Sequence, residues 1–251
     1  MDWQDDGVLL SVRPHGETAA ILEVFTAGHG RHMGVLPGGA SRARAAMLQP
    51  GTQLRLTWRA RLDEHIGTWS AEPLAQRARI LADAAALHAL GAMAALLHLG
   101  LPERQAHVRL YRPTLALLDR LDRGATGAGE DWRADYLRWE LLLLEDIGFG
   151  LDLSACAVTG RAEDLAYVSP RTGRAVSRAS AGDWAPRLLP LPGLLLGRVP
   201  PDREMATELA QGLAVTGHFL QLALAPALGD RPLPEARARL LRILARARSQ
   251  G

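Results

Sequence analysis

The residues best placed for metal chemistry lie between Cys156 and Ser180. Cys156 and Thr159 have the spacing of a Cys-x-x-Cys knuckle, and Ser177 and Ser180 repeat that spacing after a spacer. A zinc ribbon needs a thiolate at each of its four corners, and neutral hydroxyls are poor ligands for zinc. We therefore expect this segment to bind no metal and to be held by hydrogen bonds and packing instead.

Other arrangements for covalent chemistry are incomplete. The segment 15–17 has the His-x-Glu spacing of zinc deaminases but lacks the partner Cys-x-x-Cys motif. His29 and His32 have no Cys or Asp close by to complete a metal site. All 29 basic residues are arginine, which excludes a P-loop and Schiff-base chemistry. A dispersed Ser-His-Asp triad stays open, although ordinary surface serines explain the sequence as well. We predict a protein that is not an enzyme and needs no cofactor.

Arginine residues are concentrated in one stretch near the N-terminus. Residues 26–61 contain six arginines and no Asp or Glu, and glycine turns punctuate the stretch. Guanidinium groups on strands and loops suit a polyanion such as a nucleic-acid backbone, whereas the competing interpretation is an ordinary solvated face. The candidate nucleic-acid contacts are Arg31, Arg42, Arg44, Arg55, Arg59 and Arg61.

The composition indicates a folded globular protein. The chain has 251 residues, 48% of them hydrophobic, and a formal net charge of +2. This allows a substantial core and argues against disorder. Cys156 is the single cysteine, so no internal disulfide can form. The acidic N-terminus does not resemble a signal peptide, and the apolar run 81–99 contains Asp83 and two histidines, which favours a buried helix over a membrane span. We expect a cytoplasmic protein without membrane contact.

The predicted secondary structure changes from strands to helices near residue 77, and the candidate arginines lie in the part with strands. Residues 1–76 contain runs typical of strands at 7–13, 19–25, 30–36, 53–62 and 66–72, separated by glycine and proline turns. In Leu54–Arg59 apolar and polar residues alternate strictly, as in a strand with one buried face. Five short strands at this spacing predict a small closed barrel.

Residues 77–251 predict a helical domain, so the fold class is α+β. The apolar period favours helices at 80–99, 103–121, 132–147, 203–224 and 235–248. Pro113 should bend or split the second of these helices. Residues 151–182 show no period and form an insertion that contains the four ribbon-like corners.

At this point the whole chain resembles the bacterial recombination mediator family RecO. The resemblance rests on four features taken in order: Gly16-Glu17 followed by Phe25-Thr26 and Gly30-Arg31; 38–42 followed by 48–51; Glu72 before the first helix; and the degenerate corners Cys156, Thr159, Ser177 and Ser180. It implies an N-terminal OB-fold, then a helical domain with a zinc-ribbon-like insertion. Some relatives keep four cysteines, and this sequence departs from that pattern.

The resemblance also implies a function. Relatives bind single- and double-stranded DNA, anneal complementary strands and help load recombinase onto strands coated with single-strand-binding protein. The implied partners are RecR, the C-terminal tail of single-strand-binding protein and, indirectly, RecA. OB-folds hold single strands by a basic groove and aromatic stacking platforms. Phe25, Trp58 and Trp69 are the nearby candidates for platforms, and Trp58, which alternates with the arginines, fits a core position equally well.

A pocket for the acidic, apolar-ended tail is expected in the helical domain. The candidate residues are Arg109, Arg112, Arg133 and Arg138. For each of them a solvated helix face is the competing interpretation. The main alternative for the whole protein is a non-enzymatic interaction scaffold, in which the basic barrel docks an acidic protein.

Overall fold

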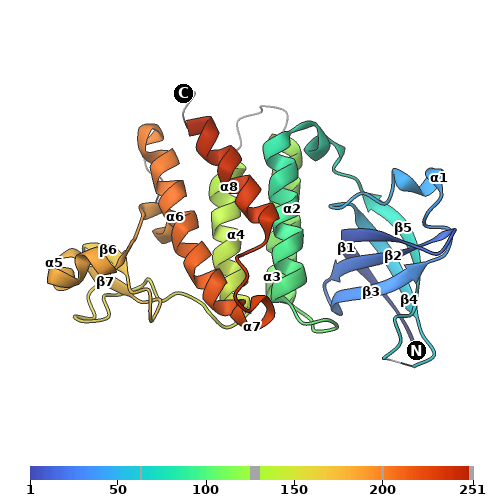
Figure 1. Ribbon diagram of the computed structural model, residues 1–251, viewed down its shortest axis with the longest axis horizontal. Coiled ribbons are helices and arrows are strands. Elements are labelled where there is room, and N and C mark those ends of the chain that lie inside the picture. The colour runs from blue at the N-terminus through green and yellow to red at the C-terminus, as the bar shows by residue number, and fades with distance from the viewer. Residues whose placement is uncertain (63, 125–130, 199–200, 249–251) are drawn as a thin grey trace. The chain divides into compact units, whose positions relative to one another are not determined.

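The computed structural model describes residues 1–62, 64–124, 131–198 and 201–248. The chain forms two compact units, residues 1–130 and 131–251. The first contains all strands of the barrel and the helices that follow it, and the second contains the remaining helices and a small sheet (Figure 1). Among the described helices, none is long and apolar enough to cross a membrane. The predicted boundary between residues 76 and 77 stays a prediction.

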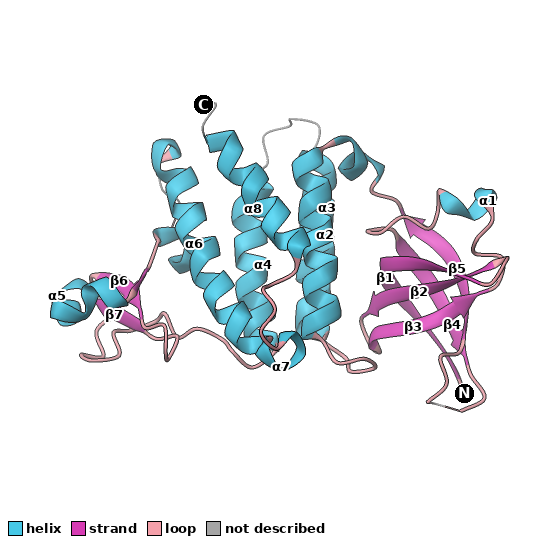
Figure 2. Ribbon diagram, in the orientation of Figure 1, coloured by secondary structure: helices cyan, strands magenta, loops and turns pink. Residues whose placement is uncertain are grey.

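Five strands close into a barrel in the first unit (Figure 2). They are β1 (Asp2–His15), β2 (Ala19–Thr26), β3 (Gly30–Leu36), β4 (Gln53–Arg59) and β5 (Thr68–Ala75). Their order around the barrel is β1-β2-β3-β5-β4, and β1 pairs antiparallel with both β2 and β4. The only parallel neighbours in the barrel are β3 and β5, which close it at Val35 and Thr68. This confirms the predicted OB-like barrel followed by helices.

The barrel interior is apolar and aromatic. Alternation along β4 is as predicted: Leu54, Leu56 and Trp58 are fully buried, whereas Arg55 and Arg59 are exposed. Burying large side chains in this way supplies the main driving force for folding. Strand β1 begins at Asp2, earlier than predicted, because it pairs along the whole length of β4 from Asp2–Arg59 to Val8–Gln53.

Helices follow the barrel within the same unit. They are the short α1 (Arg42–Ala45) between β3 and β4, then η1 (Ala78–Ala82), α2 (Ala84–Gly100) and α3 (Val108–Gly124). Asp83 caps α2 by accepting a hydrogen bond from Ala86 N at 2.8 Å. Helix α3 is not split at Pro113, which lies in its second turn. The Tyr111 hydroxyl donates to Asp6 O at 2.9 Å and so ties α3 to β1.

The second unit contains α4 (Trp132–Asp146), α6 (Asp202–Ala223), α7 (Ala225–Leu228) and α8 (Glu235–Arg248). The insertion between α4 and α6 carries β6 (Leu165–Val168), β7 (Ala175–Ser177), α5 (Arg178–Ala181), η2 (Gly182–Arg187), β8 (Leu189–Pro190) and η3 (Gly193–Leu196). Its strands form a three-stranded sheet in the order β7-β6-β8. Regular structure in the insertion thus extends beyond the predicted 151–182.

A buried ion pair joins three helices of this unit. Arg237 of α8 donates to both carboxylate oxygens of Glu140 on α4, at 2.7 and 2.8 Å. Thr216 of α6 donates to the same carboxylate at 2.5 Å, and Arg237 also donates to Leu213 O at 2.7 Å. Glu140 is completely buried and Arg237 is 4% exposed. Each charge is therefore paired and hydrogen-bonded, as burial requires.

Candidate nucleic-acid interface

A row of outward-facing side chains crosses the barrel from strand to strand. Strand pairing sets Arg13 of β1 opposite Ile21 of β2, Ile21 opposite Val35 of β3, Val35 opposite Thr68 of β5, and Thr68 opposite Arg59 of β4. Residues directly opposite one another point to the same face of a sheet. This barrel row therefore has two apolar side chains at its centre and an arginine at each end.

The loop between β4 and β5 adds basic groups beside the row. A shallow groove at this place is lined by Val35, Arg59, Arg61, His65 and Ile66, among others. Val35 N donates to Gly67 O at 3.0 Å, which fixes the end of this loop against β3. Ile66 is 43% exposed, so the groove offers apolar surface as well as guanidinium groups.

Helix α1 supplies two more arginines next to the end of β3. The Arg44 Nη1 donates to Pro37 O at 3.1 Å, and Ala40 N donates to Thr18 O at 3.0 Å. The second bond holds the start of this segment against the turn between β1 and β2. Arg42 is exposed and Arg44 is half-buried. The Arg44 guanidinium thus lies near the Val35 end of β3, and Arg42 belongs to the same short helix.

Arg31 does not fit the predicted role. Its Nη1 lies 2.7 Å from Glu23 Oε1, and its Nε donates to Leu101 O at 3.0 Å. The side chain is only 12% exposed. His98 of α2 contacts the same Glu23 oxygen at 2.8 Å. Burial raises the Glu23 pKa, but hydrogen bonds from His98 and Arg31 outweigh burial and hold it below the ordinary value. The arginine stabilises a buried carboxylate, so we leave it out of the interface.

Arg55 and Arg59 have acidic neighbours that the sequence pattern did not reveal. Arg55 lies between Asp6 of β1 and Glu72 of β5 in the strand register, and its Nε is 3.5 Å from Asp6 Oδ1. Arg59 lies opposite Asp2 on one side and Thr68 on the other. The charge of Arg55 is therefore largely balanced within the barrel, whereas Arg59 keeps one neutral flank facing the groove.

None of the three candidate stacking platforms is exposed, and Trp58 takes the alternative position in the core. Trp58 and Phe25 are completely buried, and Trp69 is 2% exposed. Trp58 and Trp69 fill the barrel around His32, whose ring centroid lies 4.8 and 5.6 Å from theirs. Phe25 instead packs edge-on against Tyr111 at 5.5 Å. Side chains that form the core cannot stack on nucleobases, so these three residues are left out of the candidate interface.

The four corners of the insertion lie together and contact one another. Ser177 N donates to Cys156 Sγ at 3.3 Å, and the Ser177 hydroxyl donates to Ser180 Oγ at 2.9 Å. Hydrogen bonds from Ser177 N–H and from Thr159 lower the Cys156 pKa to about 5. Within the described ranges, no group of three or more His, Cys, Asp or Glu could hold a metal ion. The hydroxyl-rich corners are poor zinc ligands.

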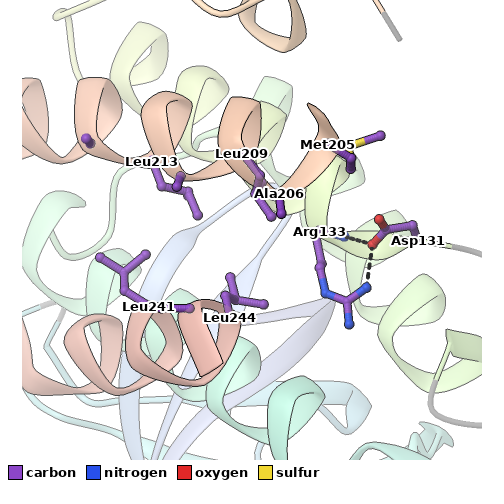
Figure 3. A pocket seen from close by; sticks show the side chains of 11 residues that line it. Asp131, Arg133, Met205, Ala206, Leu209, Leu213, Leu241 and Leu244 are labelled. Carbon is purple, nitrogen blue, oxygen red and sulfur yellow. Dashed lines mark hydrogen bonds and ion pairs between the residues drawn. The ribbon is translucent and has the colours of Figure 1, made fainter. Parts of the chain in front are cut away.

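Of the four predicted partner-binding arginines, Arg133 lines a pocket in the described part of the second unit. Arg133 lies at the edge of a cavity of about 460 Å³ in the second unit, where it pairs with Asp131 at 3.1 Å. Figure 3 shows Leu209 and Leu213 of α6 facing Leu241 and Leu244 of α8 across this cavity.

The other three lie elsewhere. Arg138 pairs with Asp135 at 3.0 Å on the exposed side of α4. Arg109 and Arg112 are exposed on α3 in the first unit. Leu137 and Trp139, which precede and follow Arg138 in the chain, are buried in the core.

Arg13 and His65 are basic interface candidates that the sequence reasoning missed. Arg13 follows the apolar run of β1, and His65 lies in a loop with Glu64, so neither belonged to the acid-free stretch. The alternation of β1 would have placed Arg13 on the outer face, but only strand order shows that it shares a row with Val35.

Comparison with known proteins agrees with this architecture. Two family models match, Recombination protein O N terminal over residues 1–77 and Recombination protein O C terminal over residues 81–232. A protein of Cereibacter sphaeroides named DNA repair protein RecO is 60% identical over 98% of this chain and 100% of its own length. Proteins of the same name from Ruegeria sp. and Dinoroseobacter shibae are 56% and 55% identical, over 98% and 99% of this chain and 99% and 100% of theirs. The chain therefore belongs to the RecO family of DNA repair proteins.

Proposed function

We propose that this protein is a non-enzymatic recombination mediator. It binds single- and double-stranded DNA, anneals complementary strands and helps load recombinase onto strands coated with single-strand-binding protein. The proposed partners are RecR, the C-terminal tail of single-strand-binding protein and, indirectly, RecA. The observation that carries the DNA-binding part is the barrel row with its flanking arginines.

The row lies where OB-folds bind oligonucleotides, across the face of β2 and β3 and between the β1–β2 and β4–β5 loops. Ile21 and Val35 give this face an apolar centre. Arg13 and Arg59 lie at the two ends of the row, Arg61 lies in the adjoining groove, and Arg44 is bound to Pro37 O just beyond β3. A phosphate chain that crosses the row would meet positive charge at both ends.

Such binding is mostly electrostatic and independent of base sequence. Each phosphate neutralised by an arginine releases a counterion, so affinity falls steeply as salt rises. The buried tryptophans of the barrel leave the bases free, which suits annealing because the bases must pair with a second strand. The protein neutralises the phosphates, and no covalent bond is made or broken.

Strand annealing in the presence of single-strand-binding protein tests the proposal. Arg42→Ala/Arg44→Ala and Arg59→Ala/Arg61→Ala should each slow annealing and weaken binding to an oligonucleotide. Loss of two phosphate contacts should reduce the slope of log K against log salt by about 1.4 for a single strand.

Arg171→Ala/Arg174→Ala removes two exposed arginines of the insertion and serves as the matched control. Equal losses in the control and the barrel variants would show only a general charge effect. If the wild type takes up no oligonucleotide even at low salt, the protein is the alternative scaffold with an acidic partner.

The pocket at Arg133 is the proposed site for the tail of single-strand-binding protein. An acidic, apolar-ended peptide needs an apolar cavity with a cation at its rim. The α6–α8 cavity has walls of Leu209, Leu213, Leu241 and Leu244, and Arg133 lies at its edge (Figure 3).

Fluorescence anisotropy with a labelled tail peptide separates this site from the exposed face of α4. Arg133→Ala should weaken binding, whereas Arg138→Ala, on the same helix but outside the cavity, should not. Equal affinities of wild type and Arg133→Ala would remove Arg133 from the site.

A further inference from the structure

Annealing requires two phosphate chains on one protein at the same time, and the barrel row provides for one. The last helix, α8, carries a second group of arginines in the other unit (Figure 1). Three of them, Arg239, Arg242 and Arg246, are exposed; we call these three the α8 stripe. The exposed fractions of the Arg239 and Arg242 side chains are 59% and 55%.

The helical period places the α8 stripe on one line. At about 100° per residue, positions 239, 242 and 246 fall within about 60° of one another. With a rise of about 1.5 Å per residue, they span roughly 10 Å along the axis. Along a duplex each strand presents a phosphate about every 3.4 Å, and an extended single strand spaces its phosphates more widely, so this length meets about two or three phosphates. The stripe thus matches about one arginine to each phosphate.

The opposite side of α8 holds the helix in place. Arg237 and Leu240 face the core, with exposures of 4% and 0%. The two hydrogen bonds from Arg237 to Glu140 fix both the rotation and the height of the helix. Because α8 cannot turn about its axis without breaking this pair, the stripe is held facing solvent. Groups fixed before binding lose less conformational entropy when the ligand arrives.

One acidic residue opposes the stripe. Glu235 is the single carboxylate in the sequence of α8, and it lies on the same line. Its Oε1 is 2.6 Å from Arg242 Nη2 and 3.5 Å from Arg239 Nε. All three side chains of these contacts are more than half exposed. An exposed pair of this kind contributes only about 0.2–1 kcal/mol, so a phosphate can displace the carboxylate.

From this geometry we propose that the α8 stripe is a second binding site for the phosphate chain of single-stranded DNA. It holds one strand while the barrel holds the other. The inference rests on the proposed function, because it supplies the second strand that annealing needs. Recognition is by charge alone and is therefore independent of base sequence. Glu235 lowers the affinity of the site by competing for two of its three arginines.

Strand stoichiometry of the full chain tests the inference. Labelled oligo-dT is used because two such strands cannot pair with each other. It is titrated at low salt into protein whose concentration lies well above the dissociation constant of the complex. The wild type should take up two strands per chain. Arg239→Ala/Arg242→Ala/Arg246→Ala should take up one, and its overall slope of log K against log salt should fall by about 2.

Two further variants separate the site from general effects. Arg171→Ala/Arg174→Ala/Arg178→Ala removes the same charge from exposed positions of the insertion and should still take up two strands. Glu235→Gln should bind the second strand about two to five times more tightly, which corresponds to the strength of an exposed ion pair. A purely structural role of the stripe gives no reason for Glu235→Gln to bind DNA more tightly.

The outcomes distinguish the two proposals. A wild type that takes up no DNA refutes the proposed function. A wild type that takes up one strand per chain refutes only the second site. So does a stripe variant that still takes up two strands, as it would if the stripe instead binds an acidic protein. Weaker second-strand binding by Glu235→Gln would also contradict the inference.

Discussion

Removing the carboxylate of Glu140 should destabilise the second unit strongly. In Glu140→Gln the side chain keeps its size but loses its charge. The guanidinium of Arg237, 4% exposed, would then be buried without a counter-charge. Burial lowers the Arg237 pKa, but the Glu140 charge outweighs this and raises it above its ordinary value. Even without Glu140, the guanidinium is expected to remain protonated at neutral pH.

The magnitude follows from the contacts that are lost. Glu140 accepts three hydrogen bonds, two from Arg237 and one from Thr216. Removing one partner of a buried, hydrogen-bonded ion pair costs about 3–5 kcal/mol. The exposed pair between Glu235 and Arg239 has 59% exposure on each side. Glu235→Ala should therefore cost less than about 1 kcal/mol and serves as the matched control.

Urea unfolding of the full chain measures the difference. Trp132 and Trp139 are buried on α4, so their fluorescence reports on the same unit as Glu140. With an m-value of about 2 kcal/mol/M, a loss of 4 kcal/mol lowers the midpoint by about 2 M. Helical circular dichroism at the same urea concentrations should show whether the whole unit unfolds together.

A double variant decides whether charge or packing causes the loss. Glu140→Leu/Arg237→Met removes both charges together, and buried ion pairs replaced in this way are often neutral or better. The double variant should therefore be more stable than Glu140→Gln. A cost below about 1 kcal/mol for Glu140→Gln would refute the reasoning. So would a double variant as unstable as the sum of Glu140→Leu and Arg237→Met.

Three further predictions concern the barrel and the insertion. The Glu23 pKa lies below its ordinary value of 4.5, so its stabilisation is complete above pH 4.5 and is lost as pH falls through the folded pKa. In acid titrations followed by circular dichroism, Glu23→Gln should be less stable than wild type at neutral pH and lose less stability on acidification. Gly30→Ala would place Cβ 1.7 Å from Gln105 O and should cost about 2–5 kcal/mol in urea unfolding. Gly16→Ala shares its positive φ, has open space around Cβ, and should cost only about 1–2 kcal/mol. Absorbance at 240 nm should show a Cys156 thiolate forming near pH 5, and a midpoint above 8 would contradict the hydrogen bonds at the corners.

The sequence predicted what depends on neighbours along the chain. Strict alternation in Leu54–Arg59 placed the buried and exposed faces of β4 correctly. The alternation could not show which residues of the neighbouring strands lie beside the exposed face of β4. Asp6 and Glu72 flank Arg55 only because β1 and β5 are the neighbours of β4. The net charge of a sheet face is set by strand order, and strand order cannot be predicted from the alternation within one strand.

Arg31 shows the same limit for a tertiary contact. The sequence predicts a nucleic-acid contact at Arg31, which requires that the outer face of β3 is open at this position. That face is covered at this end, because Arg104 N donates to Arg31 O at 2.7 Å and Leu101 O accepts from its side chain. The covering loop follows α2, some seventy residues later in the chain. Period predicts the face on which a side chain lies, but whether another element covers that face depends on long-range packing.

The hydrogen bonds among the four corners, Cys156, Thr159, Ser177 and Ser180, explain only part of the stability of the insertion. In zinc-finger peptides a structural zinc ion contributes about 10–16 kcal/mol, whereas each hydrogen bond at the corners contributes about 1 kcal/mol. The difference must be supplied by packing and by anchoring to α6. His218 of α6 contacts Pro170 O at 2.9 Å, and Gly173, with φ of +69°, approaches Leu151 and Phe219 so closely that a Cβ would touch both. The turn of the β6–β7 hairpin is therefore fixed at the end far from the corners. Anchoring of this kind does not depend on thiolates at the corners.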